Sequence, residues 1–131
     1  KERRMSSQNV MRRIEQDGRM TVGVHTASAT LAYSDLNRLH TNRGAAGAVT
    51  LTLPAASGSE GRYVDVFVVA DQNVVVAAAS GEMVAHNNAA ATSVAWSTSG
   101  DKIGSGAKFI CDGTSWLCLP NQDDAVTLTI A

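Results

Sequence analysis

Few side chains in this sequence could do chemistry, and their spacing does not favour catalysis. His25, His40 and His86 lack the close spacing that is typical of metal ligands. A Ser/His/Asp triad has no support, because the chain has no Gly-x-Ser-x-Gly turn that would expose a serine. The adjacent acids Asp123 and Asp124 would diverge on a strand, so we interpret them as a solvated turn, with a surface calcium ligand pair as the alternative. We therefore expect no enzyme activity, no metal site and no cofactor.

Glycine-rich segments and tryptophans are further candidates for ligand binding. Residues 58–62 and 100–108 are rich in glycine, but neither contains Gly-Lys-Ser/Thr and neither opens a helix, so both are predicted to be turns. Trp96 and Trp116 could form a platform on which a sugar stacks. Packing in the core or at an interface is the favoured interpretation of both side chains.

The two cysteines are interpreted as small hydrophobic residues. Cys111 and Cys118 flank an Asp112-Gly113 turn signal that predicts two antiparallel strands. With a short loop, Cys111 would lie opposite one of residues 114–116 instead of Cys118, so geometry disfavours a disulfide. Two sulfurs without a nearby histidine or a second cysteine pair also fall short of a zinc site.

The elements that must position these side chains are strands, and residues 48–54 show the pattern best. Val49, Leu51 and Leu53 alternate with Thr50 and Thr52, so apolar side chains share one face and hydroxyls the other. Residues 126–130 repeat this period near the end of the chain. Both segments predict half-buried strands.

The same reasoning predicts short strands along the rest of the chain. The remaining segments are residues 20–24, 29–33, 38–41, 62–70, 74–77, 83–85, 93–97, 107–111 and 115–119. Residues 34–37 read as a turn or one helical turn, and residues 62–70 carry apolar groups on both faces, which predicts a central strand or one at a subunit interface. The predicted fold class is all-β: an antiparallel β-sandwich, jelly-roll-like, with an N-terminal basic arm or short helix.

Composition and charge divide the chain into two parts. The chain has 131 residues, 44% of them hydrophobic, and a net charge of −1, which argues against a nucleic-acid partner. Residues 1–20 hold six basic and three acidic side chains, whereas the remainder holds five and nine. No apolar run is long enough for a membrane span. We predict an N-terminal basic arm over residues 1–19 and a β-sandwich domain over residues 20–131.

The predicted arm consists mostly of good helix formers. From residue 2 to 16, Val10, Met11 and Ile14 fall at helical spacing, and Gly18 is placed as a C-terminal cap. This apolar stripe is too thin for a helix that is stable alone. Two interpretations stay open: a frayed tail outside the domain, or an arm that docks on a neighbouring subunit or a larger assembly.

Several segments together carry a family resemblance. They are Gly-Ala-Val-Thr-Leu-Thr-Leu-Pro at 47–54, residues 62–70, Asn-Val-Val-Val-Ala at 73–77, and the Asp-Gly-Thr turn with Trp116 within residues 108–119. This pattern resembles the β-sandwich modules of tailed-bacteriophage virion proteins, in which a strand ending in Thr-Leu-Pro leads to a strand of the glycine-x-aromatic-x-valine kind, and a closing hairpin carries Asp-Gly-Thr and an aromatic residue. The likeness covers residues 38–119, and its motifs are structural.

The resemblance implies a role in a virion. The length of the chain suits a head decoration (cement) protein, which in such families forms a homotrimer on the capsid surface and binds the major capsid protein. On charge and spacing, we place the surface that contacts the capsid or a neighbouring subunit on the arm. Its residues are Arg3, Arg4, Val10, Met11, Arg12, Arg13 and Ile14. The alternative is a receptor- or carbohydrate-binding module of a tail fibre or spike, using Trp96, Trp116 or Tyr63.

Overall fold

Alternation of apolar and hydroxyl side chains forms the strand that the sequence predicts. In the computed structural model, which describes residues 20–131, strand β4 (Val49–Thr52) buries Val49 and Leu51, and Leu53 beyond its end is buried too. Thr50 and Thr52 remain half-exposed on the other face. The period of two therefore places the apolar row against the core, as expected.

Short strands make up the regular structure of the described residues. They are β1 (Val22–Val24), β2 (Ala29–Thr30), β3 (Arg38–Thr41), β4 (Val49–Thr52), β5 (Tyr63–Phe67), β6 (Val74–Ala77), β7 (Met83–Ala85), β8 (Asn88–Ala91), β9 (Ser93–Trp96), β10 (Gly106–Cys111), β11 (Trp116–Asn121) and β12 (Leu128–Ile130). One 3-10 turn, η1 (Tyr33–Asp35), follows β2 where a turn or one helical turn is expected. Between residues 20 and 131 no helix is long and apolar enough to cross a membrane.

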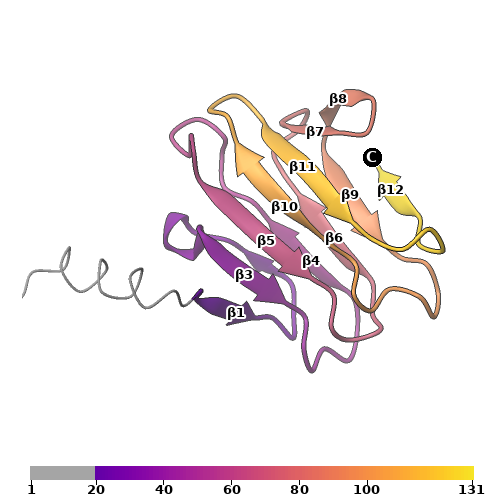
Figure 1. Cartoon of the computed structure of the whole chain (residues 1–131). Helices are drawn as coiled ribbons and strands as arrows, with labels where there is room; N and C mark the ends of the chain where they lie inside the picture. The colour runs from indigo at the N-terminus through magenta and orange to yellow at the C-terminus, as the bar shows by residue number, and fades with distance from the viewer. Residues whose placement is uncertain (1–19) are drawn as a thin grey trace, which may run out of the picture.

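Two sheets pack face to face and confirm the β-sandwich (Figure 1). Sheet A has the strand order β1-β3-β5-β10-β11-β7-β8, and sheet B has the order β12-β9-β6-β4-β2. Strand β5 lies between β3 and β10, so the prediction of a central strand for this segment is confirmed. The jelly-roll connection stays a prediction.

Pairing within each sheet is mixed, which corrects the expectation of antiparallel neighbours throughout. The chain crosses from sheet to sheet after each of β1 to β5, so β1, β3 and β5 run parallel in sheet A, and β2, β4 and β6 run parallel in sheet B. Antiparallel pairs appear later, as in the β10–β11 hairpin. Residues 22–77 thus form three coils, each made of one strand of sheet A followed by one strand of sheet B.

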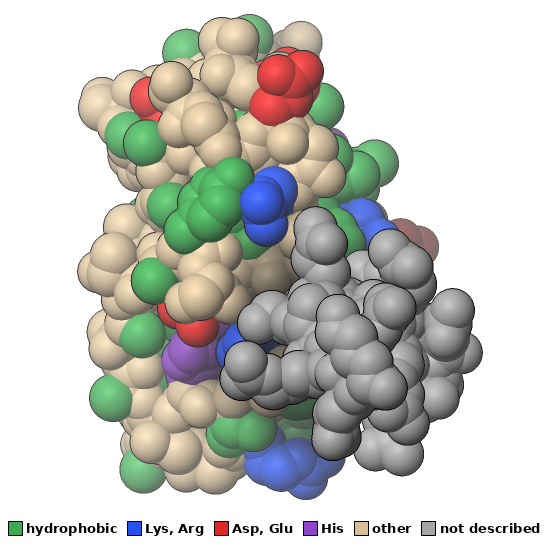
Figure 2. Space-filling model, turned by 90° about the vertical axis from the view of Figure 1, so that its left-hand side faces the viewer, with side chains coloured by type: hydrophobic (Ala, Val, Ile, Leu, Met, Phe, Trp, Pro, Cys, Tyr) green, Lys and Arg blue, Asp and Glu red, His purple; other side chains and the backbone are tan. Residues whose placement is uncertain are grey.

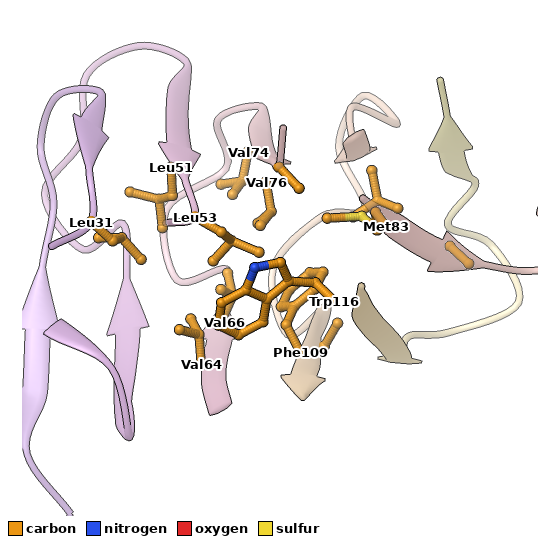
Figure 3. Close-up of a cluster of buried hydrophobic side chains, with 14 of the residues drawn as sticks. Leu31, Leu51, Leu53, Val64, Val66, Val74, Val76, Met83, Phe109 and Trp116 are labelled. Atoms are coloured by element: carbon orange, nitrogen blue, oxygen red, sulfur yellow. The ribbon is translucent and has the colours of Figure 1, made fainter. Parts of the chain in front are cut away.

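The inner faces of both sheets meet in one apolar core (Figure 3). Valines and leucines of the coils surround Phe109, Trp96 and Trp116, which have no exposed surface. Each indole N–H is satisfied, because Trp116 Nε1 donates to the Pro54 carbonyl at 2.9 Å and Trp96 Nε1 donates to Gln122 Oε1 at 2.7 Å. These bonds offset much of the cost of burying a polar N–H.

We predict that Trp116→Ala destabilises the fold by about 3–5 kcal/mol, because it leaves a large cavity beside Phe109 and frees the Pro54 carbonyl. Urea denaturation at neutral pH measures the change in the free energy of unfolding. The matched control is Leu119→Ala on the neighbouring part of β11, where the side chain is 53% exposed and the loss should stay within about 0.5 kcal/mol. Equal losses for the two variants would contradict the assignment of Trp116 to the core.

Candidate interaction surface

The strand register of sheet A assembles one row of side chains on the face that points away from the core. Pairing of β1, β3, β5, β10 and β11 places five residues side by side. These residues are Val22, Leu39, Asp65, Lys108 and Leu119. The row above it contains Tyr63, Ile110 and Leu117, and the row below contains Val24 and Phe67. We call these ten residues the outer face.

Large apolar side chains stay exposed on the outer face. Val22 is 51% exposed, Val24 57%, Phe67 44% and Leu119 53%. An open hollow of about 270 Å³ runs between Leu39, Phe67 and Leu119 over the backbone of β5 and β10. Exposed apolar groups gathered on one rigid sheet are typical of a surface that binds another protein.

One charged pair lies in the middle of the outer face. Lys108 Nζ is 4.0 Å from Asp65 Oδ2 and 4.8 Å from the centre of the Tyr63 ring. Because Lys108 is about half exposed, this ion pair contributes little to the stability of the fold. At an interface this ion pair would fix the orientation of the partner, because the partner must place opposite charges at matching positions.

The residues that the sequence assigns to capsid contact are not among those that the structure describes. Arg3, Arg4, Val10, Met11, Arg12, Arg13 and Ile14 all fall within residues 1–19, outside the described residues. The same holds for the predicted helix over residues 2–16. The assignment of these contacts stays a prediction, whereas the outer face is a surface that sequence reasoning did not single out.

Other candidate ligand sites are resolved by burial and turn geometry. Both tryptophans belong to the core, as expected, and neither is available to stack against a sugar. Asp123 accepts a hydrogen bond from the Ala125 N–H at 3.0 Å in an exposed turn. Gly58 and Gly100 lie in turns with positive φ, as expected for these glycine-rich segments, whereas residues 106–108 belong to strand β10, which corrects the predicted turn there. Within residues 20–131, no three His, Cys, Asp or Glu side chains gather as metal ligands.

Two histidines that look unrelated in the sequence lie in contact. His25 Nε2 is 2.8 Å from His40 Nδ1, and the rings stack with centroids 5.0 Å apart. The parallel pairing of β1 with β3 brings them together, and a period-two pattern does not reveal pairing direction. In the space-filling view from the left of Figure 1, a histidine reaches the surface beside acidic and basic side chains, and hydrophobic groups are scattered over the same side (Figure 2).

Comparison with known proteins leaves the chain without a family assignment: no family model matches it, and no similar curated protein is found. Functional inference therefore starts from the outer face, the histidine pair and the sequence resemblance.

Both thiols are free and held in an environment that disfavours the thiolate. Burial raises the pKa of Cys118 to about 12. Burial also raises the pKa of Cys111, although the Gly113 N–H bonded to its sulfur acts in the opposite direction. Cys111 lies opposite Trp116, and Cys118 lies opposite Phe109, so the expectation that the two cysteines do not face each other is confirmed.

We predict that neither thiol reacts readily with Ellman's reagent in the folded protein at pH 8, because little thiolate is present and access is limited. Cys118 should react at least about a hundredfold more slowly than in urea, since each unit of pKa is worth a factor of ten. A Cys118→Ala variant isolates Cys111 for the same measurement. Rapid labelling of either thiol before unfolding would show that the hairpin is open.

Proposed function

We propose that this chain is a structural virion protein that binds the outer surface of a phage capsid and stabilises it, as a head decoration protein. Support comes from two sources. The first is the sequence resemblance over residues 38–119. The second is the outer face, the observation that carries the proposal within the described residues.

The outer face suits binding to a large, flat protein surface. A sheet presents its side chains on a fixed lattice, so Phe67 and Leu119 need no reordering before they are buried by a partner. The hollow between them and Leu39 is open and shallow, and it offers a seat for an apolar side chain of the partner. We assign the capsid shell as that partner, with the outer face as the contact surface of the sandwich.

The arm supplies a second contact in this proposal. Residues 1–20 carry a net charge of +3 and the remainder −4, so the arm of one copy is complementary to the body of the next copy or to an acidic capsid surface. The chain reaches the sandwich at β1, the edge of the outer face, so arm and outer face engage neighbouring parts of one assembly. A homotrimer would repeat these contacts three times.

Stabilisation of the capsid follows from linkage. A protein that binds only the expanded shell shifts the equilibrium toward that state by mass action. Many copies with modest individual affinity become effective together, because neighbouring contacts raise the local concentration. A single chain therefore does not need a high-affinity binding site for the capsid.

A receptor- or carbohydrate-binding module on a tail fibre is the alternative function. Burial of Trp96 and Trp116 counts against it, because an exposed aromatic pair is the feature that would favour it. Tyr63 is half-exposed, but Lys108 lies over its ring. No described feature favours this alternative over the decoration role.

The location of the chain is tested by mass spectrometry and electron microscopy of the virion that carries it. The proposal predicts hundreds of copies on the head, grouped at symmetry axes. A few copies confined to the tail would overturn it and make glycan binding the next measurement.

The two contact surfaces are tested by reconstitution on capsids stripped of this protein. Deletion of residues 1–19 should abolish or strongly reduce occupancy while the sandwich stays folded. Phe67→Glu should weaken attachment about tenfold or more, because a charge would be buried in the contact. The matched control is Ile103→Glu: Ile103 is 63% exposed and lies beside Asp123, outside the strand rows. Unchanged occupancy for Phe67→Glu would remove the outer face from the contact, and unchanged occupancy for the deletion would remove the arm.

A further inference from the structure

The contact between His25 and His40 has a defined hydrogen-bond arrangement. His40 is 1% exposed, and its Nε2 lies 2.8 Å from the carbonyl oxygen of Asp35. A carbonyl only accepts, so His40 Nε2 carries the proton and His40 Nδ1 presents a lone pair. His25 Nε2 must then donate its proton to His40 Nδ1 across the 2.8 Å contact. The geometry thus assigns the neutral Nε2–H tautomer to His40 and fixes the direction of the bond from His25.

This pair fastens an edge strand. His25 follows β1, the outermost strand of sheet A, and His40 belongs to β3, the only strand with which β1 pairs in the described part of the chain. Besides the pair, β1 is held by its backbone ladder to β3, and next to this ladder the His25 N–H donates to the Thr41 carbonyl at 2.9 Å and the Leu39 N–H donates to the Thr21 carbonyl at 3.0 Å. A strand of three residues has few other contacts to hold it in place.

Gly23 leaves the space that the pair occupies. A Cβ added at this position would lie 2.8 Å from His40 Nδ1 and 3.4 Å from His25 Nε2. The first distance is shorter than any real contact of a Cβ, and its partner is a buried ring that is also held by Asp35. The two rings therefore fit only against a glycine at position 23, because a side chain at that position would displace them.

The arrangement tolerates one added proton but not two. A first proton can occupy Nδ1 of His25 and leave the Nε2–H to Nδ1 bond intact. A second proton must occupy His40 Nδ1, which removes the acceptor of this bond and places two imidazolium rings in contact within a part-buried site. Burial and the neighbouring His40 lower the pKa of His25 from 6.5, and the Asp35 carboxylate acts in the opposite direction.

Few charged groups surround the pair. On η1, the Asp35 carboxylate is held 3.9 Å from Arg38 Nη1 of β3, so its attraction for a protonated histidine is partly neutralised. Strand β5 places Val66 beside His40 and turns Asp65 to the outer face. No charged side chain of the inner faces therefore compensates a second proton within the described residues.

We propose that the His25–His40 pair is a proton-sensitive clamp that holds edge strand β1 on sheet A at neutral pH and releases it in acid. Within the pair, His25 binds its proton less readily than it does in an unfolded chain. Its contribution to the stability of β1 is therefore present above the ordinary histidine pKa of 6.5 and is lost as the pH falls below that value. The clamp stands on the geometry of β1 and β3 and does not depend on the capsid role.

Amide hydrogen exchange of the whole chain, followed by NMR between pH 7.5 and 5.0, tests the clamp. Protection factors of the His25 and Leu39 amides, corrected for intrinsic exchange, should fall up to about tenfold per pH unit for each proton taken up. The Phe109 amide, on strand β10 between β5 and β11, should keep its protection, which separates release of β1 from global unfolding.

Two variants sharpen the test. His25→Gln places an uncharged amide opposite His40 Nδ1, and this amide can donate to that nitrogen or accept from it, so the β1 amides should keep the same protection across the pH range. The matched control is His86→Asn at the exposed turn between β7 and β8, where φ is positive, and it should behave like the wild type. Wild-type amides that keep their protection at pH 5.0 would overturn the clamp, as would an acid-induced loss that persists in His25→Gln.

A direct titration covers the case in which His25→Gln does not hold β1 at neutral pH. Imidazole nitrogen shifts of the wild type should show His40 as the Nε2–H tautomer at pH 7.5 and uptake of a proton by His25 below pH 6.5. Protonation of His25 at its ordinary pKa, without any response of the β1 amides, would refute the proposal.

Discussion

The structure depends on burial of the inner faces of two sheets against each other. Most strands contribute alternate residues to this layer, which valine, leucine, phenylalanine and tryptophan fill together with alanines, Met83 and Cys111. Once that layer is fixed, the remaining residues of each strand must point outward, because a shift by one residue would exchange the two faces. Exposure of Phe67 and Leu119 on the outer face is therefore a direct consequence of how Val66 and Phe109 are packed.

Two buried polar side chains, Asn42 and Lys102, hold loops of the sandwich in place by hydrogen bonds. The buried Asn42 side chain accepts hydrogen bonds from the backbone N–H groups of Val69 and Ala70, at 2.7 and 2.9 Å, and donates to the Ala70 carbonyl at 3.0 Å. Lys102, 5% exposed, reaches Asp71 Oδ1 at 3.0 Å and the Thr98 carbonyl at 3.1 Å. The hydrogen bonds of Asn42 and Lys102 fix the loops that connect the two sheets. Strand β1 is fastened instead by a pair of titratable histidine rings.

The alternation of apolar and polar residues predicts where strands lie in the sequence, but it does not predict which strands pair or in which direction. Strands β3, β6 and β7 begin and end where their residue types indicate, because apolar periodicity reports burial directly. Strand β8 was missed, since Asn88 and three alanines lack such a period. Pairing direction was wrong for the coils because a parallel and an antiparallel strand share the same alternation. The histidine contact and the outer face both depend on that direction, so no local signal could have identified them.

The coiled winding of residues 22–77 also bears on how the chain folds. Parallel partners within a sheet are separated by a full passage through the other sheet, as with Val22 and Leu39 or Val49 and Val74. Forming such a contact requires closure of a long loop, which costs chain entropy before the contact stabilises anything. The β10–β11 hairpin needs only a short loop. We expect the hairpin and its antiparallel neighbours to form the folding nucleus and the coils to add afterwards toward β1. The strand nearest the arm would then be the last to form and the first to open, so the edge of the fold is also its kinetic weak point.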